Sequence, residues 1–76
     1  MASLKTEIRA KEAEIISRNK GKATLSLAAL ARELGAGEII ARRWAEERGI
    51  GIPIGTRVRY EIGQVAKFMV QERGMY

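Results

Sequence analysis

The first twenty residues carry the apolar spacing of one amphipathic helix. The stripe consists of Leu4, Ile8, Lys11 and Ile15. Glu14 stands four residues before Arg18, the spacing of an ion pair on a helix surface. Gly21 ends the pattern, because it favours the left-handed conformation and no apolar spacing follows it directly. The narrow stripe leaves three arrangements open: packing on the rest of the chain, pairing with another subunit, or an arm that orders on DNA.

Two short helices joined by a tight turn follow. Ser26 is a good N-cap for a helix over 27–34, and Gly35 ends that helix. The joint at 35–37 is short enough to make the next helix, over 38–48, cross the first one steeply. The core side of the first helix consists of Leu27, Leu30, Ala31 and Leu34. The core side of the second consists of Ile40, Ala41, Trp44 and Ala45, and its outward side of Glu38, Ile39, Arg42, Arg43 and Glu46.

A β-hairpin and a closing helix complete the pattern. Gly55 and Thr56 form the turn between two alternating strands, and Pro53 marks the first strand as an edge or irregular strand. The closing helix is expected over 64–73, with Gly74 past its end. The hairpin residues predicted to face the core are Ile50, Ile52, Ile54, Val58, Tyr60 and Ile62. The residues predicted to face outward are Arg57, Arg59 and Glu61.

Composition narrows the possible functions. The chain has 76 residues, with 14 Lys and Arg against 9 acidic residues, and contains no Cys and no His. All of its acidic residues are Glu. The usual thiolate and imidazole metal ligands, nucleophiles and bases are therefore missing, so we expect no enzyme, no metal and no cofactor. One compact core fits this length, and the lack of a long apolar run predicts a soluble, cytoplasmic protein.

The positive charge is spread along the chain, but four arginines fall on two neighbouring elements. Arg42 and Arg43 lie on the outward side of the second short helix, and Arg57 and Arg59 lie one strand period apart beside the hairpin turn. Such cations can contact a nucleic-acid backbone, and Ile39 suits a thymine methyl in the major groove. In the alternative interpretation, the helix arginines are merely solvated and paired with Glu38, Glu46 or Glu47. The candidate DNA-binding residues are Lys22, Glu38, Ile39, Arg42, Arg43, Thr56, Arg57 and Arg59.

Four motifs follow one another between residues 24 and 69. They are LxxLARELG ending at Gly35, ARRWAEERG ending at Gly49, GTRVRY from Gly55 to Tyr60, and QVAKFM at the start of the last helix. In this order and spacing the segment resembles the small winged-helix DNA-binding domains of the excisionase and MerR-like group. The resemblance implies a mostly α fold with a small β-hairpin. It places a winged helix-turn-helix domain over 23–74, after an N-terminal amphipathic helix over 1–20.

The resemblance also implies roles for single residues. Glu38, Ile39, Arg42 and Arg43 would enter the major groove. The hairpin would be the wing, and its Arg57 and Arg59 would touch the DNA backbone or the neighbouring minor groove. Gly37 departs from the pattern, since such proteins often have a capping Ser or Thr at this position.

We therefore expect a small, non-catalytic protein that binds double-stranded DNA at specific sequences. The resemblance implies an excisionase-type recombination directionality factor of a phage or mobile element, acting in a bacterial or phage-infected cell. Its partners would be DNA and a recombinase or other phage protein, with copies bound as a homodimer or in a head-to-tail row. A phage transcription regulator and the DNA-recognition module of a packaging complex are alternatives. An alternative of another class is a protein-interaction adaptor whose partner surface consists of Leu4, Ile8, Ile15 and Met69.

Overall fold

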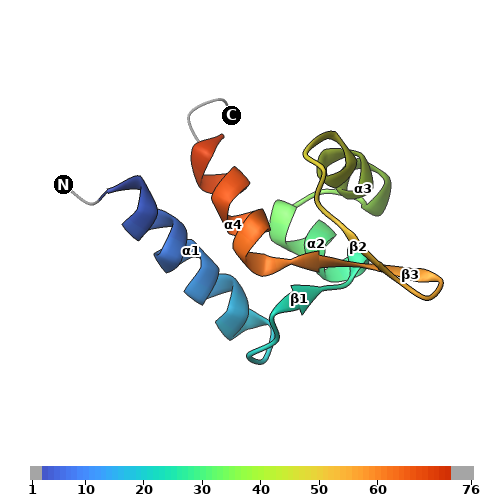
Figure 1. The fold of residues 1–76 in the computed structure, drawn as a ribbon, viewed down its shortest axis with the longest axis horizontal. Helices are drawn as coiled ribbons and strands as arrows, with labels where there is room; N and C mark the ends of the chain where they lie inside the picture. The colour runs from blue at the N-terminus through green and yellow to red at the C-terminus, as the bar shows by residue number, and fades with distance from the viewer. Residues whose placement is uncertain (1–2, 73–76) are drawn as a thin grey trace.

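A computed structural model describes residues 3–72, which form a mostly helical body with a small antiparallel sheet (Figure 1). The bounds of the elements in this part are α1 Leu4–Arg18, β1 Thr24–Leu25, α2 Leu27–Leu34, α3 Glu38–Glu47, β2 Ile52–Ile54, β3 Arg57–Glu61 and α4 Ile62–Gln71. The predicted class, mostly α with a small β component, is confirmed at this level. No helix within residues 3–72 combines the length and the apolar character needed to cross a membrane.

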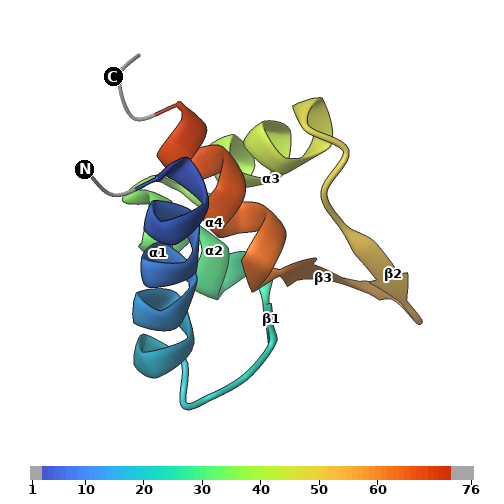
Figure 2. The same cartoon turned by 60° about the vertical axis from the view of Figure 1, so that its left-hand side comes forward.

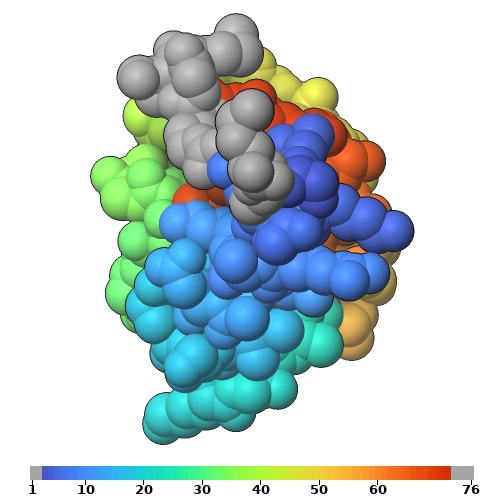
Figure 3. Space-filling view, turned by 90° about the vertical axis from the view of Figure 1, so that its left-hand side faces the viewer, coloured from blue at the N-terminus to red at the C-terminus, as the bar shows by residue number. Residues whose placement is uncertain are grey.

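α1 lies along α4, and the two helices form one side of the molecule (Figures 1 and 2). The helix begins where the Ser3 hydroxyl accepts a hydrogen bond from the Thr6 N–H at 3.2 Å. Ile15 is fully buried, and Ile8 and Ile16 pack against the same core. Of the three arrangements that the sequence leaves open, α1 thus adopts packing on the rest of the chain. In the space-filling view α1 covers this side, and the segment that follows it lies at the lower end (Figure 3).

A turn of three residues joins α2 to α3. The Ser26 hydroxyl accepts a hydrogen bond from a backbone N–H in the first turn of α2, at 3.1 Å. α2 ends at Gly35, whose φ of 67° is a left-handed conformation that glycine adopts without strain. The N-cap of α3 is Gly37, which has no side chain to cap the helix. Ala41 and Ala45 of α3 are fully buried, so α3 is held in place by close packing of small side chains.

β3 is the central strand of the sheet, whose order is β1-β3-β2 with both pairings antiparallel. Tyr60 of β3 pairs with Leu25 of β1, and both are buried, so this face of the sheet covers the core. The β2–β3 hairpin extends beyond the helices (Figures 1 and 2). Val58 is on the same face as Tyr60, two residues nearer the turn, and is 42% exposed because the body does not reach it.

The prediction that Ile52 and Ile54 face the core is wrong. Ile52 pairs with Arg59 and Ile54 with Arg57, and directly paired residues lie on the same face of a sheet. The two isoleucines therefore share the outer face with the arginines and are 44% and 59% exposed. The cause is the register that the two-residue turn imposes on the hairpin. Ile50, which precedes the hairpin, is buried as predicted.

The core cluster draws residues from every element of the described chain except β2. It consists of Ile15, Leu25, Ala29, Leu30, Ala31, Ala41, Ala45, Ile50, Tyr60, Ile62, Val65 and Ala66. Trp44 packs against this core from α3, as predicted for a packing residue. Ile40 does not, and its predicted core position is wrong, because it is 60% exposed. Ile40 precedes the buried Ala41 by one position, which rotates it by about 100° around the helix, away from the contact that Ala41 makes.

α4 begins at Ile62, two residues before the predicted start. The Ile62 N–H donates to the Ala23 carbonyl at 3.0 Å, which ties the first turn of α4 to the residue before β1. The predicted helix end at Arg73, with Gly74 after it, lies outside the described residues.

Candidate nucleic-acid interface

The outward side of α3 is open to solvent. Glu38, Ile39, Arg42 and Arg43 are all exposed, and Ile39 is 78% exposed. Neither Arg42 nor Arg43 forms an ion pair with a carboxylate of residues 3–72. The pairing with Glu38, Glu46 or Glu47 that the alternative interpretation expects is therefore not formed in this part of the chain, whereas both arginines are exposed to solvent, as it also expects. α3 presents two exposed arginines without an ion pair beside an exposed branched aliphatic side chain, and the same helix carries Glu38, Glu46 and Glu47.

A hollow of about 330 Å³ lies where α3, the hairpin and the start of α2 meet; we call it the hairpin hollow. It is lined by Ser26, Leu27, Arg42, Thr56, Arg57, Val58, Arg59 and Tyr60. Three of these residues are arginines and none is acidic, so the potential in the hollow is positive. The structure thus brings together four of the candidate residues: Arg42, Thr56, Arg57 and Arg59. Glu38, Ile39 and Arg43 lie outside the hollow on the exposed surface of α3.

The two hairpin arginines differ in their surroundings. Arg57 is exposed and has no hydrogen-bond or ion-pair partner within residues 3–72. Arg59 is half-buried and donates two hydrogen bonds to Thr24, one to the hydroxyl and one to the backbone carbonyl, both at 3.1 Å. Because Thr24 belongs to β1, Arg59 holds the hairpin against the body. Arg57 is free to contact a partner, whereas Arg59 first positions the strand that carries Arg57.

Lys22 lies on a second surface. A hollow of about 220 Å³ between the α1–β1 segment and α2 is lined by Arg18, Asn19, Lys20, Lys22, Thr24, Leu25, Ser26, Ala29, Arg32 and Arg59. We call it the loop hollow. Sequence reasoning named Lys22 but missed Lys20 and Arg32. The two lysines of residues 20–22 are visible as a basic pattern, but only the fold places Arg32 of α2 beside them.

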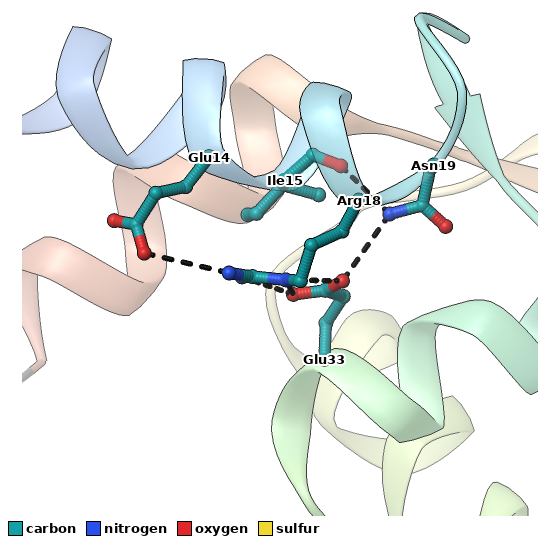
Figure 4. Close-up of polar contacts among 5 residues, drawn as sticks. All are labelled: Glu14, Ile15, Arg18, Asn19 and Glu33. Carbon is teal, nitrogen blue, oxygen red and sulfur yellow. Dashed lines mark hydrogen bonds and ion pairs between the residues drawn. The ribbon is translucent and has the colours of Figure 1, made fainter.

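A network of charged side chains fixes the end of α1 on α2 (Figure 4). The guanidinium of Arg18 donates from Nη2 to Glu33 Oε1 at 2.7 Å and also contacts Glu14 at 3.4 Å. Asn19 donates from Nδ2 to Glu33 Oε2 at 3.2 Å and to the Ile15 carbonyl at 2.7 Å. The Arg18 hydrogen bonds lower the pKa of the Glu33 carboxyl, and this effect outweighs partial burial, which raises it. The carboxylate is thus held ionised, and Arg18 is neutralised within the protein.

The surface expected for a protein-interaction adaptor is not present as predicted. Ile15 is fully buried, and Ile8 and Met69 are only partly exposed and pack against the core. Leu4 alone of the four predicted residues counts as exposed. The predicted surface is absent because the packing of α1 on α4 buries most of the apolar stripe of α1.

Comparison of the chain with protein-family models, with curated proteins and with solved structures gives no significant match.

Proposed function

We propose that this chain is a sequence-specific double-stranded DNA-binding protein of the winged helix-turn-helix type. In this proposal α3 is the recognition helix and the β2–β3 hairpin is the wing. The observation that carries it is the hairpin hollow, where Arg42 of α3 and Arg57 of the hairpin line one surface without an acidic residue. Two elements that offer cations to one surface are what holding a duplex requires, because phosphate contacts fix the register of a protein on DNA.

α3 would lie in the major groove, which is about 12 Å wide and admits one α-helix. Arg42 would donate two hydrogen bonds to a guanine edge, and Ile39 would contact a thymine methyl. The absence of a carboxylate partner for Arg42 supports this role, since its donors need not be released from an ion pair before binding. Arg43 would contact the flanking phosphates from the same helix.

The hairpin would follow the backbone or enter the neighbouring minor groove through Arg57. The hydrogen bonds from Arg59 to Thr24 support this role, because they fix the hairpin before DNA arrives. A fixed contact element loses less conformational entropy on binding than a mobile one.

The biological role that fits such a protein is an excisionase-type recombination directionality factor of a phage or mobile element. A small non-catalytic protein of this kind would bind beside a recombinase site and direct the recombinase. Footprinting on candidate phage DNA separates this role from its alternatives. Protection of recombination sites supports it, protection of promoters supports a transcription regulator, and protection of a packaging start supports a packaging module.

The proposal is tested by selecting a binding sequence from a random duplex pool and measuring its affinity against salt. With four to six phosphate contacts, the logarithm of the association constant should fall against the logarithm of salt concentration with a slope of about −4 to −5. Arg42→Ala should cost about 1–3 kcal/mol and relax the preference at one base position. Arg57→Lys, which keeps the charge, should have a mild effect on every sequence.

Arg9→Ala is the matched control, because it removes one exposed arginine from α1, far along the chain from α3. It should leave base preference unchanged and weaken binding only slightly. Equal losses for Arg42→Ala and Arg9→Ala would show that α3 does not read the DNA. Absence of binding to any duplex at low salt would refute the function itself.

A further inference from the structure

The loop hollow gathers positive charge that no carboxylate of its lining balances. Five of its lining residues are Lys or Arg, and none is acidic. Arg18 is compensated by Glu33 and Glu14, and Arg59 donates to Thr24. Lys20, Lys22 and Arg32 form no ion pair with the described carboxylates. Three like charges around one hollow repel one another, so an anion seated there would relieve the repulsion.

The segment that carries the lysines has a fixed and locally unfavourable backbone. Lys20 has a φ of 58° and Gly21 a φ of 76°, two consecutive left-handed residues. This conformation is unfavourable for a lysine, and such conformations persist where the surroundings impose them. Here the Gly21 N–H donates to the Ile16 carbonyl at 2.9 Å, and Asn19 is held by Glu33. The two lysines are therefore presented by a loop with a defined shape.

The loop hollow adjoins the hairpin hollow. Ser26 and Arg59 line both of them, so the two form one continuous cationic strip around the start of α2. The strip runs from Lys20 and Lys22, past Arg32 and Arg59, to Arg57 and Arg42. A polyanion that occupies one hollow would reach the other without crossing a stretch lined by carboxylates.

From these observations we infer that the loop hollow is a second binding site for phosphodiester groups of a nucleic-acid backbone. This inference rests on the proposed function: the duplex that lies on α3 and the hairpin continues onto residues 20–22 and Arg32. A duplex that ends beside the hairpin would leave the loop hollow empty, and a longer duplex would fill it.

The test compares a loop variant, Lys20→Gly with Lys22→Ala, with a control variant, Lys5→Ala with Arg9→Ala. Both lose two positive charges, and the control charges lie on the first half of α1. Lys20→Gly also relieves the left-handed strain, so the loop variant should keep its fold, which a thermal melt followed by circular dichroism verifies. Binding of the selected sequence is measured over a range of salt concentrations in a duplex of about 25 base pairs. It is also measured in two shorter duplexes, each truncated on one side of the selected sequence.

For the long duplex, the loop variant should show a salt slope shallower by about 2 and an affinity lower by on the order of tenfold at about 0.1 M salt. Its base preference should not change. The difference from wild type should shrink on the truncated duplex that lacks the loop-side flank. The control variant should keep the wild-type slope within about 0.5.

Equal slopes for the loop and control variants on the long duplex would overturn the inference. If Arg42→Ala still changed base preference in that case, the proposed function would stand and only the second site would be lost. A wild-type protein that bound none of these duplexes would overturn both the second site and the proposed function.

Discussion

On the α1 side of the molecule an arginine forms an ion pair with a glutamate: Arg18 Nη2 lies 2.7 Å from Glu33 Oε1. On the α3–hairpin side, Arg42, Arg43 and Arg57 have no carboxylate partner within residues 3–72. The aliphatic residues follow the same division, since Ile15 of α1 is fully buried and Ile39 of α3 is 78% exposed. Residues of the same type therefore stabilise the fold on one side and remain available for contacts on the other.

The small size of the chain makes this difference between the two sides informative. At about 0.05–0.15 kcal/mol per residue, its free energy of unfolding should be roughly 4–11 kcal/mol. Exposed isoleucines and unpaired arginines add little to that total. Within residues 3–72 the exposed isoleucines all lie on α3 and β2, and this concentration is explained better by contact with a partner than by stability.

The largest difference should come from truncating the two isoleucines. Ile15→Ala leaves a cavity in the core and should lower the free energy of unfolding by about 2–5 kcal/mol, with a melting temperature lower by on the order of 10 °C or more. Ile39→Ala should change it by no more than about 0.5 kcal/mol and should weaken DNA binding instead. Urea unfolding and duplex titration of both variants measure the two effects. Equal destabilisation by the two substitutions would mean that Ile39 is packed within the protein and is not available to a partner.

A paired and an unpaired arginine should differ in the same way with a smaller effect, even within α3 and its C-cap, Arg48. Arg48 pairs with Glu72, donates to the Trp44 carbonyl at 2.8 Å, and lies over the Trp44 ring. Arg48→Ala should therefore cost about 1–3 kcal/mol of unfolding free energy. Arg43→Ala should stay within about 0.5 kcal/mol, because no described partner is lost. Thermal melts of the two variants decide this, and a large loss for Arg43→Ala would count against the comparison.

The smallest effect should be the pH dependence that Glu33 contributes. Its folded-state pKa is lowered, so the stabilisation is present above the unfolded pKa of about 4.3 and is lost as pH falls through the lower folded value. Glu33→Gln should therefore be less stable than wild type at neutral pH. The difference should shrink as the pH is lowered below about 4. Glu46→Gln on exposed α3 is the control, and a difference between wild type and Glu33→Gln that did not vary with pH would refute this assignment.

The sequence predicted those parts of the fold whose signals are local. The bounds of α2 agree with the prediction because Ser26 and Gly35 mark its two ends within the chain itself. The turn at Gly55 and Thr56 was predicted for the same reason. The faces of Ile52 and Ile54 were not, because they depend on the register of the hairpin and on how far it extends beyond the body.

In the candidate site, too, the sequence predicted the local features and not the long-range ones. Helix periodicity and strand alternation were enough to place Arg42 on the outward side of α3 and Arg57 on the outward side of the hairpin. Their meeting in one hollow depends on the angle between α3 and the sheet, which no local pattern encodes. Arg32 was missed for that reason: the two lysines that it joins in the loop hollow, Lys20 and Lys22, are ten or more residues away in the sequence.

β2 is one of the two edge strands of the sheet, and its middle residue is Pro53. A proline has no backbone N–H, so this edge lacks a donor that an additional strand would need in order to pair with it. A short apolar strand with exposed Ile52 and Ile54 would otherwise be a template for sheets that grow from molecule to molecule. The pyrrolidine ring thus protects against aggregation at the place where the chain leaves branched aliphatic groups in water.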